Sequence, residues 1–545
     1  MKRFCHNLLL LIVSGISLPS IGQPLPKVQV PTFKKDTFNI KKFGAIADGM
    51  TLNTVSINSA IDACNKNGGG TVLVPNGFWL TGPIVIKSNV DLHISRGAVL
   101  QFTSDFDQYP LVEGNFEGVP AFRNQSPLSA TNAENIAVTG DGVIDGNGDA
   151  WRMVKRDKQT ETQWKKLVAS GGSLSEDGKT WYPTQKTVLG SKTKEPGVIK
   201  PGVTRKDVEA YKDFLRPNLF VLTRCKKILL QGVTFQNSPA WDLHPLMCED
   251  MTVREIYAKN PFYAQNGDGI DIESCKNFIV ENSTFDVGDD GICIKSGRDA
   301  EGRKRGMPTE NGIIRNCIVY HAHGGFVIGS EMSGGAKNLY VSNCTFIGTD
   351  VGLRFKTARG RGGIVEKIYV SHINMKDIAG EAILFDMYYM AKDPVPLAGE
   401  KRDAPKVELL PVTEGTPQFR DFHVKDIVCD GAETAILIRG LPEMSIKDID
   451  LQDMVIKSRI GVVCEEASGI QIKNLNLVTT GSGPQINILN GNNISFEGMK
   501  YKDGADLLIS LNGERTAHIS LKNMDTSKAK KKAQFGNGVK ESVLN

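Results

Sequence analysis

The chain has 545 residues, 40% of them hydrophobic and 23% charged, and is long enough to bury a large core. A formal net charge of only +4 argues against a nucleic-acid-binding protein. The 56 glycines and an aromatic content of 7% favour many turns and short strands over a bundle of helices.

The first 22 residues have the pattern of a secretory signal peptide. Lys2 and Arg3 precede an apolar run from Leu8 to Val13, and small residues near Ser20 offer a cleavage site. The apolar run is too short to span a bilayer. We therefore expect a periplasmic or secreted protein without stable membrane insertion after the signal is removed.

A helix is predicted to begin near Thr54. Ile57, Ala60, Ile61 and Cys64 fall on one of its faces, as in an amphipathic helix that covers a core. Its position ahead of the repeated segments described next suits a cap, because the end of a stack of repeats needs a cover.

Segments of alternating apolar and polar residues recur along the chain, and each opens with a polar pair. The second residues of six such pairs are Lys227, Asp250, Asn277, Asn311, Asn338 and Lys367, at separations of 23, 27, 34, 27 and 29 residues. Alternation with period two predicts strands, and an irregular period of this size predicts a solenoid. Most copies carry a second short strand, so we predict an all-β parallel β-helix with like residues stacked about 4.8 Å apart. A leucine-rich repeat is the alternative, but its leucine and asparagine spacing is missing.

The repeat is interrupted between residues 152 and 216 by a polar, locally helical stretch. We interpret this stretch as a surface insertion, and long insertions in solenoids often lie on the binding face. Residues 37–520 are then one β-helix domain that includes the insertion, and residues 521–545 are a basic, solvated C-terminal tail.

The chain has ten cysteines but no CxxC pair, which makes a zinc site improbable. Their spread along the repeat favours small buried side chains in the core. Secretion permits disulfides, and the sequence leaves them open.

Charged side chains gather in consecutive coils. Asp268 and Asp271 lie in QNGDGIDIES, Asp289 and Asp290 in VGDDGICIKSG, His323 in HAHGGFVIGSE, and Arg354 and Lys356 in GLRFKTARGRGG. Asp268 and Asp289 are 21 residues apart, close to one coil, so the set is expected to form a strip of acids, imidazole and cations along one face. Each motif alone is more typical of a solvated turn or a packed histidine. Four such motifs in register with the repeat instead indicate a functional site.

Such a strip suits hydrolysis of a glycosidic bond in an anionic sugar chain. The reaction needs a protonated carboxyl group for the leaving oxygen and an ionised carboxylate that activates water or attacks. Acids packed together cannot all ionise easily, which raises the pKa of at least one. The arginine fork and the lysine charge suit a sugar carboxylate.

In this order the motifs resemble the polygalacturonase family, glycoside hydrolase family 28. Its Asn-Thr-Asp, Gly-Asp-Asp, Gly-His-Gly and Arg-Ile-Lys elements correspond here to Asn266–Asp268, Gly288–Asp290, Ala322–Gly324 and Arg354–Lys356. Gly267, Ala322 and Phe355 depart from the family residues without removing a reacting group. The segments FNIKKFGAIADGM and GDGVIDGNGDAW are also similar to the family.

The resemblance implies a right-handed parallel β-helix that cleaves α-1,4-linked galacturonic acid in pectic chains with inversion, through carboxyl groups about 6.5–9.5 Å apart. It implies Asp289 as general acid, Asp268 and Asp290 as the residues that hold and activate water, and His323 as the residue that tunes the acid. Arg354 and Lys356 would bind a uronate carboxylate, and Tyr388, or else Tyr389, would contact a sugar ring. We expect a monomer that needs no cofactor or metal ion.

If the insertion closes one end of the groove, the enzyme trims chain ends, and we hypothesise exo action on that basis. A rhamnogalacturonan or xylogalacturonan hydrolase of the same family remains open. A calcium-dependent pectate lyase fits the clustered acids but explains the histidine and the Arg-x-Lys element less well. A non-catalytic carbohydrate-binding β-helix would not explain the ordered acids.

Overall fold

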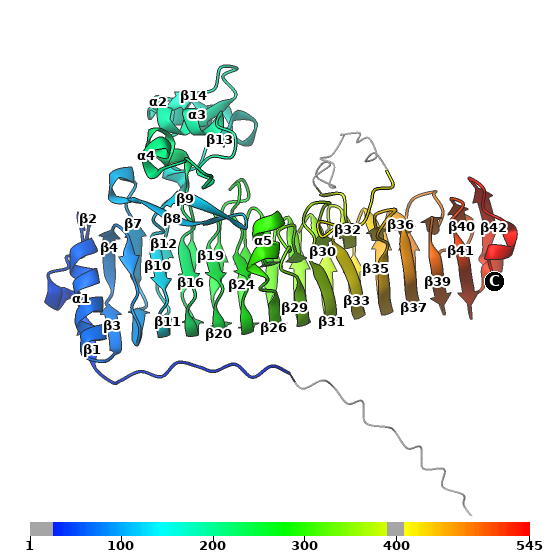
Figure 1. Cartoon of the computed structure of the whole chain (residues 1–545), viewed down its shortest axis with the longest axis horizontal. Coiled ribbons are helices and arrows are strands. Elements are labelled where there is room, and N and C mark those ends of the chain that lie inside the picture. The colour runs from blue at the N-terminus through cyan, green and yellow to red at the C-terminus, as the bar shows by residue number, and fades with distance from the viewer. Residues whose placement is uncertain (1–24, 390–407) are drawn as a thin grey trace, which may run out of the picture.

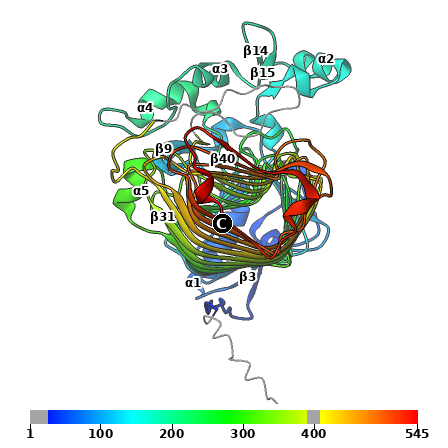
Figure 2. The same cartoon turned by 90° about the vertical axis from the view of Figure 1, so that its right-hand side faces the viewer.

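The computed structural model describes residues 25–389 and 408–545, and the expected signal peptide lies outside these residues. The chain winds into a long stack of coils, with the N-terminal coils at one end and the C-terminal coils at the other (Figure 1). Seen along the long axis, the strands of successive coils superpose (Figure 2). No helix among the described residues is long and apolar enough to cross a membrane.

Two long parallel sheets form the walls of the stack within residues 25–389 and 408–545. The 14-stranded sheet consists of β5 (Ile84–Val85), β10 (Leu128–Thr131), β16 (Phe220–Thr223), β19 (Leu243–Leu246), β22 (Ile270–Glu273), β25 (Asp290–Lys295), β28 (Gly324–Ile328), β30 (Val351–Lys356), β32 (Glu381–Asp386), β34 (Thr434–Arg439), β36 (Ile460–Glu465), β38 (Ile486–Leu489), β40 (Ala505–Asn512) and β42 (Ala529–Gly536). It contributes one strand to each coil, in chain order.

The 23-stranded sheet completes the coils. In the described part of the chain it consists of β1 (Thr37–Asn39), β2 (Asp48–Leu52), β3 (Gly70–Val74), β4 (Gly77–Thr81), β6 (Val90–Ile94), β7 (Ala98–Phe102), β11 (Glu134–Gly140), β12 (Val143–Asp145), β17 (Lys226–Gln231), β18 (Thr234–Gln236), β20 (Glu249–Arg254), β21 (Tyr257–Lys259), β23 (Lys276–Glu281), β24 (Thr284–Asp286), β26 (Thr309–Arg315), β27 (Ile318–Tyr320), β29 (Ala336–Ile347), β31 (Ile364–Lys376), β33 (Gln418–Asp430), β35 (Ile446–Ser458), β37 (Ala467–Thr479), β39 (Asn492–Glu497) and β41 (Ala517–Lys522). The predicted parallel β-helix is confirmed.

The polar residues that mark the repeat have a physical role in each coil. All six marker residues, from Lys227 to Lys367, have a φ between 53° and 59°. This left-handed conformation is easiest for Asn and Asp among residues with a side chain. The marker asparagines also form a ladder, because Asn311 Nδ2 donates to Asn277 Oδ1 at 3.2 Å and Asn338 Nδ2 to Asn311 Oδ1 at 3.1 Å. The polar pair therefore bends every coil at the same place.

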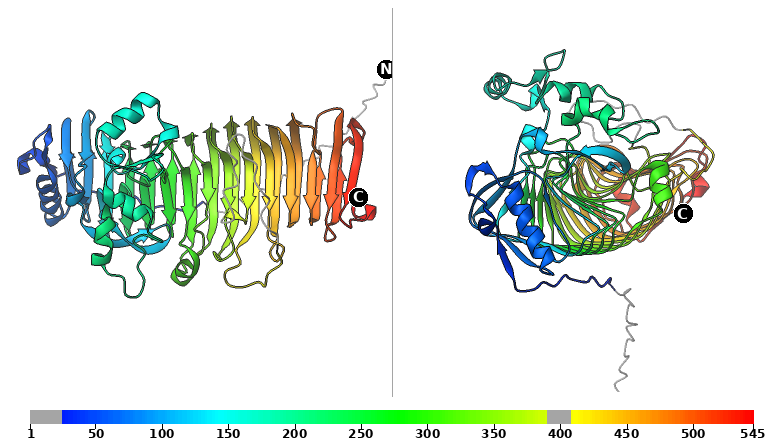
Figure 3. Two further views of the ribbon diagram at one scale, coloured as in Figure 1. Left: turned by 90° about the horizontal axis from the view of Figure 1, so that it is seen from above. Right: turned by 60° about the vertical axis from the view of Figure 1, so that its left-hand side comes forward.

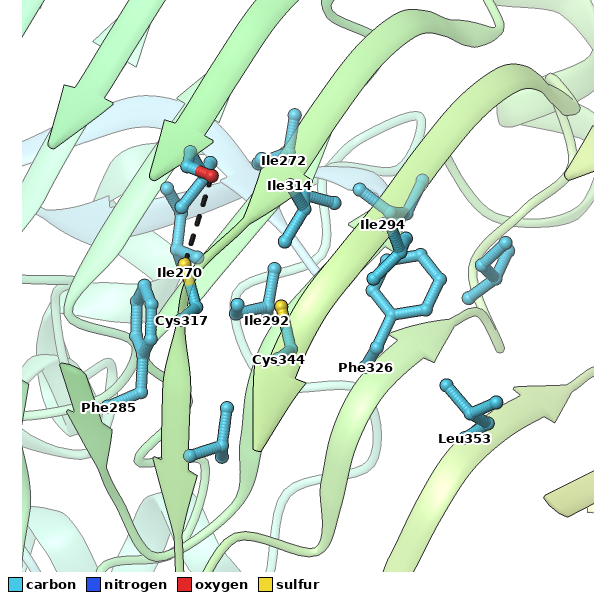
Figure 4. Close-up of a cluster of buried hydrophobic side chains, with 14 of the residues drawn as sticks. Ile270, Ile272, Phe285, Ile292, Ile294, Ile314, Cys317, Phe326, Cys344 and Leu353 are labelled. Atoms are coloured by element: carbon cyan, nitrogen blue, oxygen red, sulfur yellow. Dashed lines mark hydrogen bonds between the residues drawn. The ribbon is translucent and has the colours of Figure 1, made fainter. Parts of the chain in front are cut away.

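The core is a continuous cluster of buried apolar side chains that extends from Ile40 to Ile519. In the middle coils, alternate residues of the 14-stranded sheet point inward, such as Ile270, Ile292 and Phe326 (Figure 4). Burying one such side chain contributes about 1.5–3 kcal/mol. The nine described cysteines are buried free thiols, so none of them forms a disulfide.

The predicted cap is helix α1 (Thr54–Lys66), with Ile57, Ala60, Ile61 and Cys64 buried. The expected C-terminal tail is wrong. Strand β42 pairs in parallel with β40, with Ala529 opposite Ala505 and Gly536 opposite Asn512, and so adds a further strand to the stack. Lys530, Lys531 and Lys532 of this terminal strand are all exposed, so its composition is that of a solvated tail.

The stretch between residues 152 and 216 leaves the stack and forms short helices and a small sheet above the N-terminal coils (Figures 1 and 3). Its elements are β13 (Val154–Lys155), α2 (Glu161–Ala169), β14 (Ser173–Leu174), β15 (Thr180–Tyr182), α3 (Gln185–Ser191) and α4 (Arg205–Val208). An antiparallel hairpin of β8 (Leu111–Phe116) and β9 (Val119–Asn124) lies beneath it, and α5 (Asp299–Arg305) follows β25.

Candidate active site

The strand register brings the predicted carboxylates together. β22 pairs with β25 so that Ile270 lies opposite Ile292, and Gly269 N donates to Asp290 O at 3.0 Å. Asp268 is therefore level with Asp290 on the neighbouring coil. β25 pairs with β28 with Asp290 opposite Gly324, which places His323 beside Asp289. One coil equals one strand spacing, so residues 22 or 34 apart in sequence lie opposite each other on neighbouring coils.

Asp290 is held between two cations. Arg354 Nη1 donates to Asp290 Oδ1 at 3.0 Å, and Lys356 Nζ donates to Asp290 Oδ2 at 2.7 Å. All three side chains are at least 95% buried. Burial opposes ionisation of Asp290, but Lys356 and Arg354 outweigh it and hold the pKa of this carboxyl group well below its ordinary range. Asp290 is thus a carboxylate at any working pH.

Asp289 is partly exposed and pairs with an imidazole. Its Oδ1 lies 3.1 Å from His323 Nδ1, and its side chain is 23% exposed. Burial disfavours both charges, but the hydrogen bond and the mutual attraction lower the pKa of Asp289 and raise that of His323 to about 9. On the other side of the ring, His323 Nε2 lies 3.7 Å from Asp350 Oδ2. In the free protein this pair is an imidazolium beside a carboxylate.

Asp268 has the opposite electrostatic character. It is 3% exposed, and its Oδ1 has no hydrogen-bond partner. Burial, then the nearby charges of Asp271 and Asp289, raise the pKa of Asp268 well above its usual value. Asp271 is fully buried and its pKa is also raised, mainly by burial, with Lys295 acting against the shift. The cluster therefore carries a proton on its deeper carboxyl groups.

Sequence reasoning missed a second charged group behind these acids. Lys295 Nζ lies 2.9 Å from Glu331 Oε2, 3.5 Å from Asp271 Oδ1 and 5.1 Å from the centre of the Trp241 ring. Burial opposes ionisation of Glu331, but Lys295 and Arg361 lower its pKa to about 2. The sequence did contain a signal for Lys295. In GICIKSG, period-two alternation places Lys295 on the same outer face of the sheet as Cys293. Nothing in the sequence around Glu331 pointed to it.

The structure places the two candidate tyrosines, Tyr388 and Tyr389, in different surroundings. Tyr388 is 7% exposed and packs into the hydrophobic core. Tyr389 instead faces the cations, with Lys356 Nζ 4.9 Å and the Arg354 guanidinium 5.9 Å from its ring centre. Strand β32 ends at Asp386, so the strict alternation that would orient a following tyrosine no longer applies.

The β8–β9 hairpin lies beside these residues. The tip of the β8–β9 hairpin reaches the loop after β25, where Arg298 N donates to Gly118 O at 3.2 Å and Arg298 Nη1 lies 3.1 Å from Glu117 Oε2. The Phe116 ring stacks on Trp241 with centroids 5.9 Å apart. Trp241 immediately precedes the coil of β19, so the hairpin covers the outer face of the 14-stranded sheet on the N-terminal side of the acids.

The 152–216 insertion supports this hairpin from behind. Phe122 N donates to Gly197 O at 2.8 Å, and Ile199 N donates to Pro120 O at 3.0 Å. Leu111 and Phe122 of the hairpin share a small apolar cluster with Val208 and Leu215 of the insertion. The insertion thus contacts the base of the hairpin and supports its position.

A metal ion fits the acids poorly. Asp268, Asp289 and Asp290 each offer one oxygen, and these atoms lie within 4.8 Å of one another. Hard cations prefer such oxygens. However, both oxygens of Asp290 already accept hydrogen bonds from Arg354 and Lys356, whose charges repel a divalent ion.

Comparison with known proteins places this arrangement in a family. A family model described as Glycosyl hydrolases family 28 matches residues 165–416. The solved structure of a hyperthermoactive exopolygalacturonase from Thermotoga maritima aligns with a TM-score of 0.66 and 32% identity, over 83% of this chain and 93% of that one. The chain belongs to glycoside hydrolase family 28. Two further relatives are named for action on polygalacturonate.

A probable polygalacturonase from Vitis vinifera is 28% identical over 443 residues, which are 78% of this chain and 77% of that protein. An exo-poly-alpha-D-galacturonosidase from Dickeya chrysanthemi is 28% identical over 413 residues, 74% of this chain and 64% of that protein. This family 28 protein is a polygalacturonase-type glycoside hydrolase, as its motifs predicted.

Proposed function

We propose that this hydrolase is an exo-acting polygalacturonase, which releases short products from the end of a galacturonate chain. The observation that carries the proposal is the wall formed by the β8–β9 hairpin. A polysaccharide lying along the outer face of the 14-stranded sheet, over Asp289 and Lys356, meets Phe116 and Glu117 on the N-terminal side. A chain end fits against such a wall, whereas the middle of a long chain does not.

The electrostatics support distinct roles for the acids. Asp290 is locked in its ionised form by Arg354 and Lys356, which suits a group that polarises a water molecule. Both of its oxygens are engaged, which makes it a poor nucleophile and favours attack by water with inversion. Asp268 lies on the next coil, level with Asp290, and helps to hold that water.

We assign Asp289 as the general acid because its side chain is the most exposed of the three, at 23%, and can reach a glycosidic oxygen. In the free protein its proton resides on His323, 3.1 Å away. A bound sugar removes water from both groups, and a neutral acid beside a neutral imidazole is then favoured over an ion pair. The proton moves from His323 Nδ1 to Asp289 Oδ1 and from there to the leaving oxygen. The attacking water gives its proton to the Asp290 carboxylate, and exchange with solvent then restores both groups.

Arg354 and Lys356 are proposed to bind the uronate carboxylate. Both side chains lie on strand β30, two strands along the sheet from Asp290, and both reach back to its carboxylate beside Asp289. Tyr389, over both cations, is placed to contact the sugar ring of the same unit.

The decisive experiment follows product lengths with time on polygalacturonate and on a panel of defined pectic oligosaccharides. Exo action yields products of one or two units from the first time points and little early loss of viscosity. A ladder of intermediate lengths would instead show endo action, and preference for a rhamnose- or xylose-bearing panel member would reassign the substrate. Proton NMR of the first product decides inversion, since an α-linked substrate should give the β anomer.

The wall can be tested separately. Replacing Asn115–Pro120 by a two-residue turn removes the hairpin tip but leaves Leu111 and Phe122 to pack on the insertion. We expect intermediate-length products from this variant, with the overall rate of bond cleavage kept within about tenfold. Deleting the 152–216 insertion should have a similar effect, because the hairpin loses its support. Unchanged products of one or two units from both variants would show that neither segment is the wall.

A further inference from the structure

A pocket distinct from the acids lies between the β8–β9 hairpin and the coils of β5, β10, β16 and β19. Its volume is about 870 Å³, within the range of small-ligand sites. Hairpin residues form one side, strands of the 14-stranded sheet form the floor, and the end of α5 closes another side. None of the proposed catalytic residues lines it. Neither the family motifs nor the proposed mechanism gives this pocket a role.

The pocket contains a buried arginine without a counter-ion. Arg123 is 8% exposed, and its guanidinium lies 3.8 Å from the centre of the Phe116 ring. Its one protein hydrogen bond runs from Nη2 to the carbonyl oxygen of Arg216, and no carboxylate within residues 25–389 and 408–545 forms an ion pair with it. The nearby Glu117 is paired with Arg298. A buried charge without a partner is costly, so the fold leaves a place here for an anion.

Two amide oxygens of the same pocket also lack donors. Asn124 Nδ2 donates to the carbonyl oxygens of Lys212 and Leu215 at 2.7 and 2.9 Å. Asn218 Nδ2 lies 3.2 Å from His244 Nδ1. The Oδ1 atoms of both asparagines are buried and have no hydrogen-bond partner. Both side chains line the pocket, so hydroxyl groups of an occupant are donors within reach as the side chains adjust.

We propose that this pocket binds a uronic acid unit, with its carboxylate on Arg123 and its hydroxyl groups toward Asn124 and Asn218. An arginine fork matches a carboxylate, and amide oxygens without a donor match sugar hydroxyls. Lys304 at the end of α5 is exposed, has no partner in the described chain and adds positive charge at the rim. The proposal rests on the proposed substrate class. The bound unit is either the terminal sugar of the substrate chain or a separate acidic saccharide.

The test is direct binding of D-galacturonate by isothermal titration calorimetry, with D-galactose as the matched neutral sugar. Arg123→Gln removes the charge, and Arg123→Lys keeps it if the glutamine variant folds poorly. Arg156→Gln, an exposed arginine of the insertion paired with Glu161, is the control. A charge-assisted hydrogen bond is worth about 1.5–3 kcal/mol. The Kd for galacturonate at this site should therefore rise at least tenfold in Arg123→Gln and stay unchanged in Arg156→Gln. Galactose should bind weakly to the parent and to every variant.

Kinetics then identify the source of the bound unit. If it is the substrate end, Arg123→Gln raises KM for oligogalacturonides of three or more units and leaves kcat nearly unchanged. If it is a separate saccharide, KM stays constant and only the binding of free galacturonate is lost. Equal galacturonate binding by the parent and Arg123→Gln, or equal binding of galactose and galacturonate, would overturn the proposal. Because binding is measured directly, this result is independent of whether the protein proves to be an exo-polygalacturonase.

Discussion

His323 Nδ1 lies 3.1 Å from Asp289 Oδ1, and this contact couples the charge of the imidazole to that of the carboxylate. Burial opposes the imidazolium, but Asp289 raises the pKa of His323 to about 9, above the unfolded value of about 6.5. A group with a raised pKa stabilises the fold below its unfolded pKa, and this stabilisation is lost as the pH rises through the folded pKa. The pair should therefore stabilise the protein near pH 6 and cease to do so above about pH 9.

His323→Asn is expected to lower the free energy of unfolding at about pH 6 and to leave it unchanged at about pH 10. The effect should be under about 1 kcal/mol, because the His323 side chain is 46% exposed and solvent screens the pair. Urea unfolding at the two pH values measures it. An equal loss at both values would mean that His323 stabilises by packing and that its charge is irrelevant.

Asp289→Asn tests the assignment of the general acid. Loss of a positioned acid lowers kcat by about 10²–10⁴-fold on a natural sugar leaving group. A 4-nitrophenyl galacturonide needs little protonation, so the variant should retain most of its activity on this substrate. Asp268→Asn and Asp290→Asn should lose activity on both substrates, since they act on water. If Asp268→Asn alone is rescued by the aryl substrate, the acid is Asp268 and the assignment is wrong.

Lys356→Met tests the charge balance around Asp290. Removing one partner of a buried ion pair costs about 3–5 kcal/mol, because the other charge remains buried. The pKa of Asp290 is lowered in the folded protein, so the stabilisation exists above its unfolded pKa and disappears as the pH falls. The variant should be much less stable than the parent near pH 7 and closer to it near pH 3. A difference in unfolding free energy that does not change with pH would contradict this account.

The strip of acids and cations could be predicted because each residue occupies the same offset in its coil. Period-two alternation gives the outward face, and the left-handed polar residue, as at Asn277 and Asn311, marks where each coil begins. The hairpin wall was not predictable, because Glu117 and Arg298 are 181 residues apart and no repeat connects them. Tyr388 and Tyr389 could not be told apart from the sequence, because strand β32 ends at Asp386 and alternation no longer says which of them faces outward. The last coil was missed because a lysine-rich terminal strand has the composition of a tail.

Chelators should leave the activity unchanged. Asp268, Asp289 and Asp290 have the spacing of a cation site, but Arg354 and Lys356 already neutralise Asp290. We expect the rate on polygalacturonate with excess EDTA to equal that with added calcium, and the products to show no ultraviolet absorbance from a double bond. Activity that is lost in EDTA, restored by calcium and accompanied by such absorbance would identify a lyase.

The two adjacent tyrosines should separate stability from substrate binding. Tyr388 is 7% exposed and packed in the core, so Tyr388→Ala should lower the free energy of unfolding by about 3–5 kcal/mol, as for other large aromatic truncations. Tyr389 covers Lys356 and Arg354, so Tyr389→Ala should change stability by less than about 1 kcal/mol and raise KM for oligogalacturonides severalfold. Thermal unfolding and steady-state kinetics of both variants measure this difference. If Tyr388→Ala raised KM without loss of stability while Tyr389→Ala had no kinetic effect, Tyr388 would be the residue that contacts the sugar.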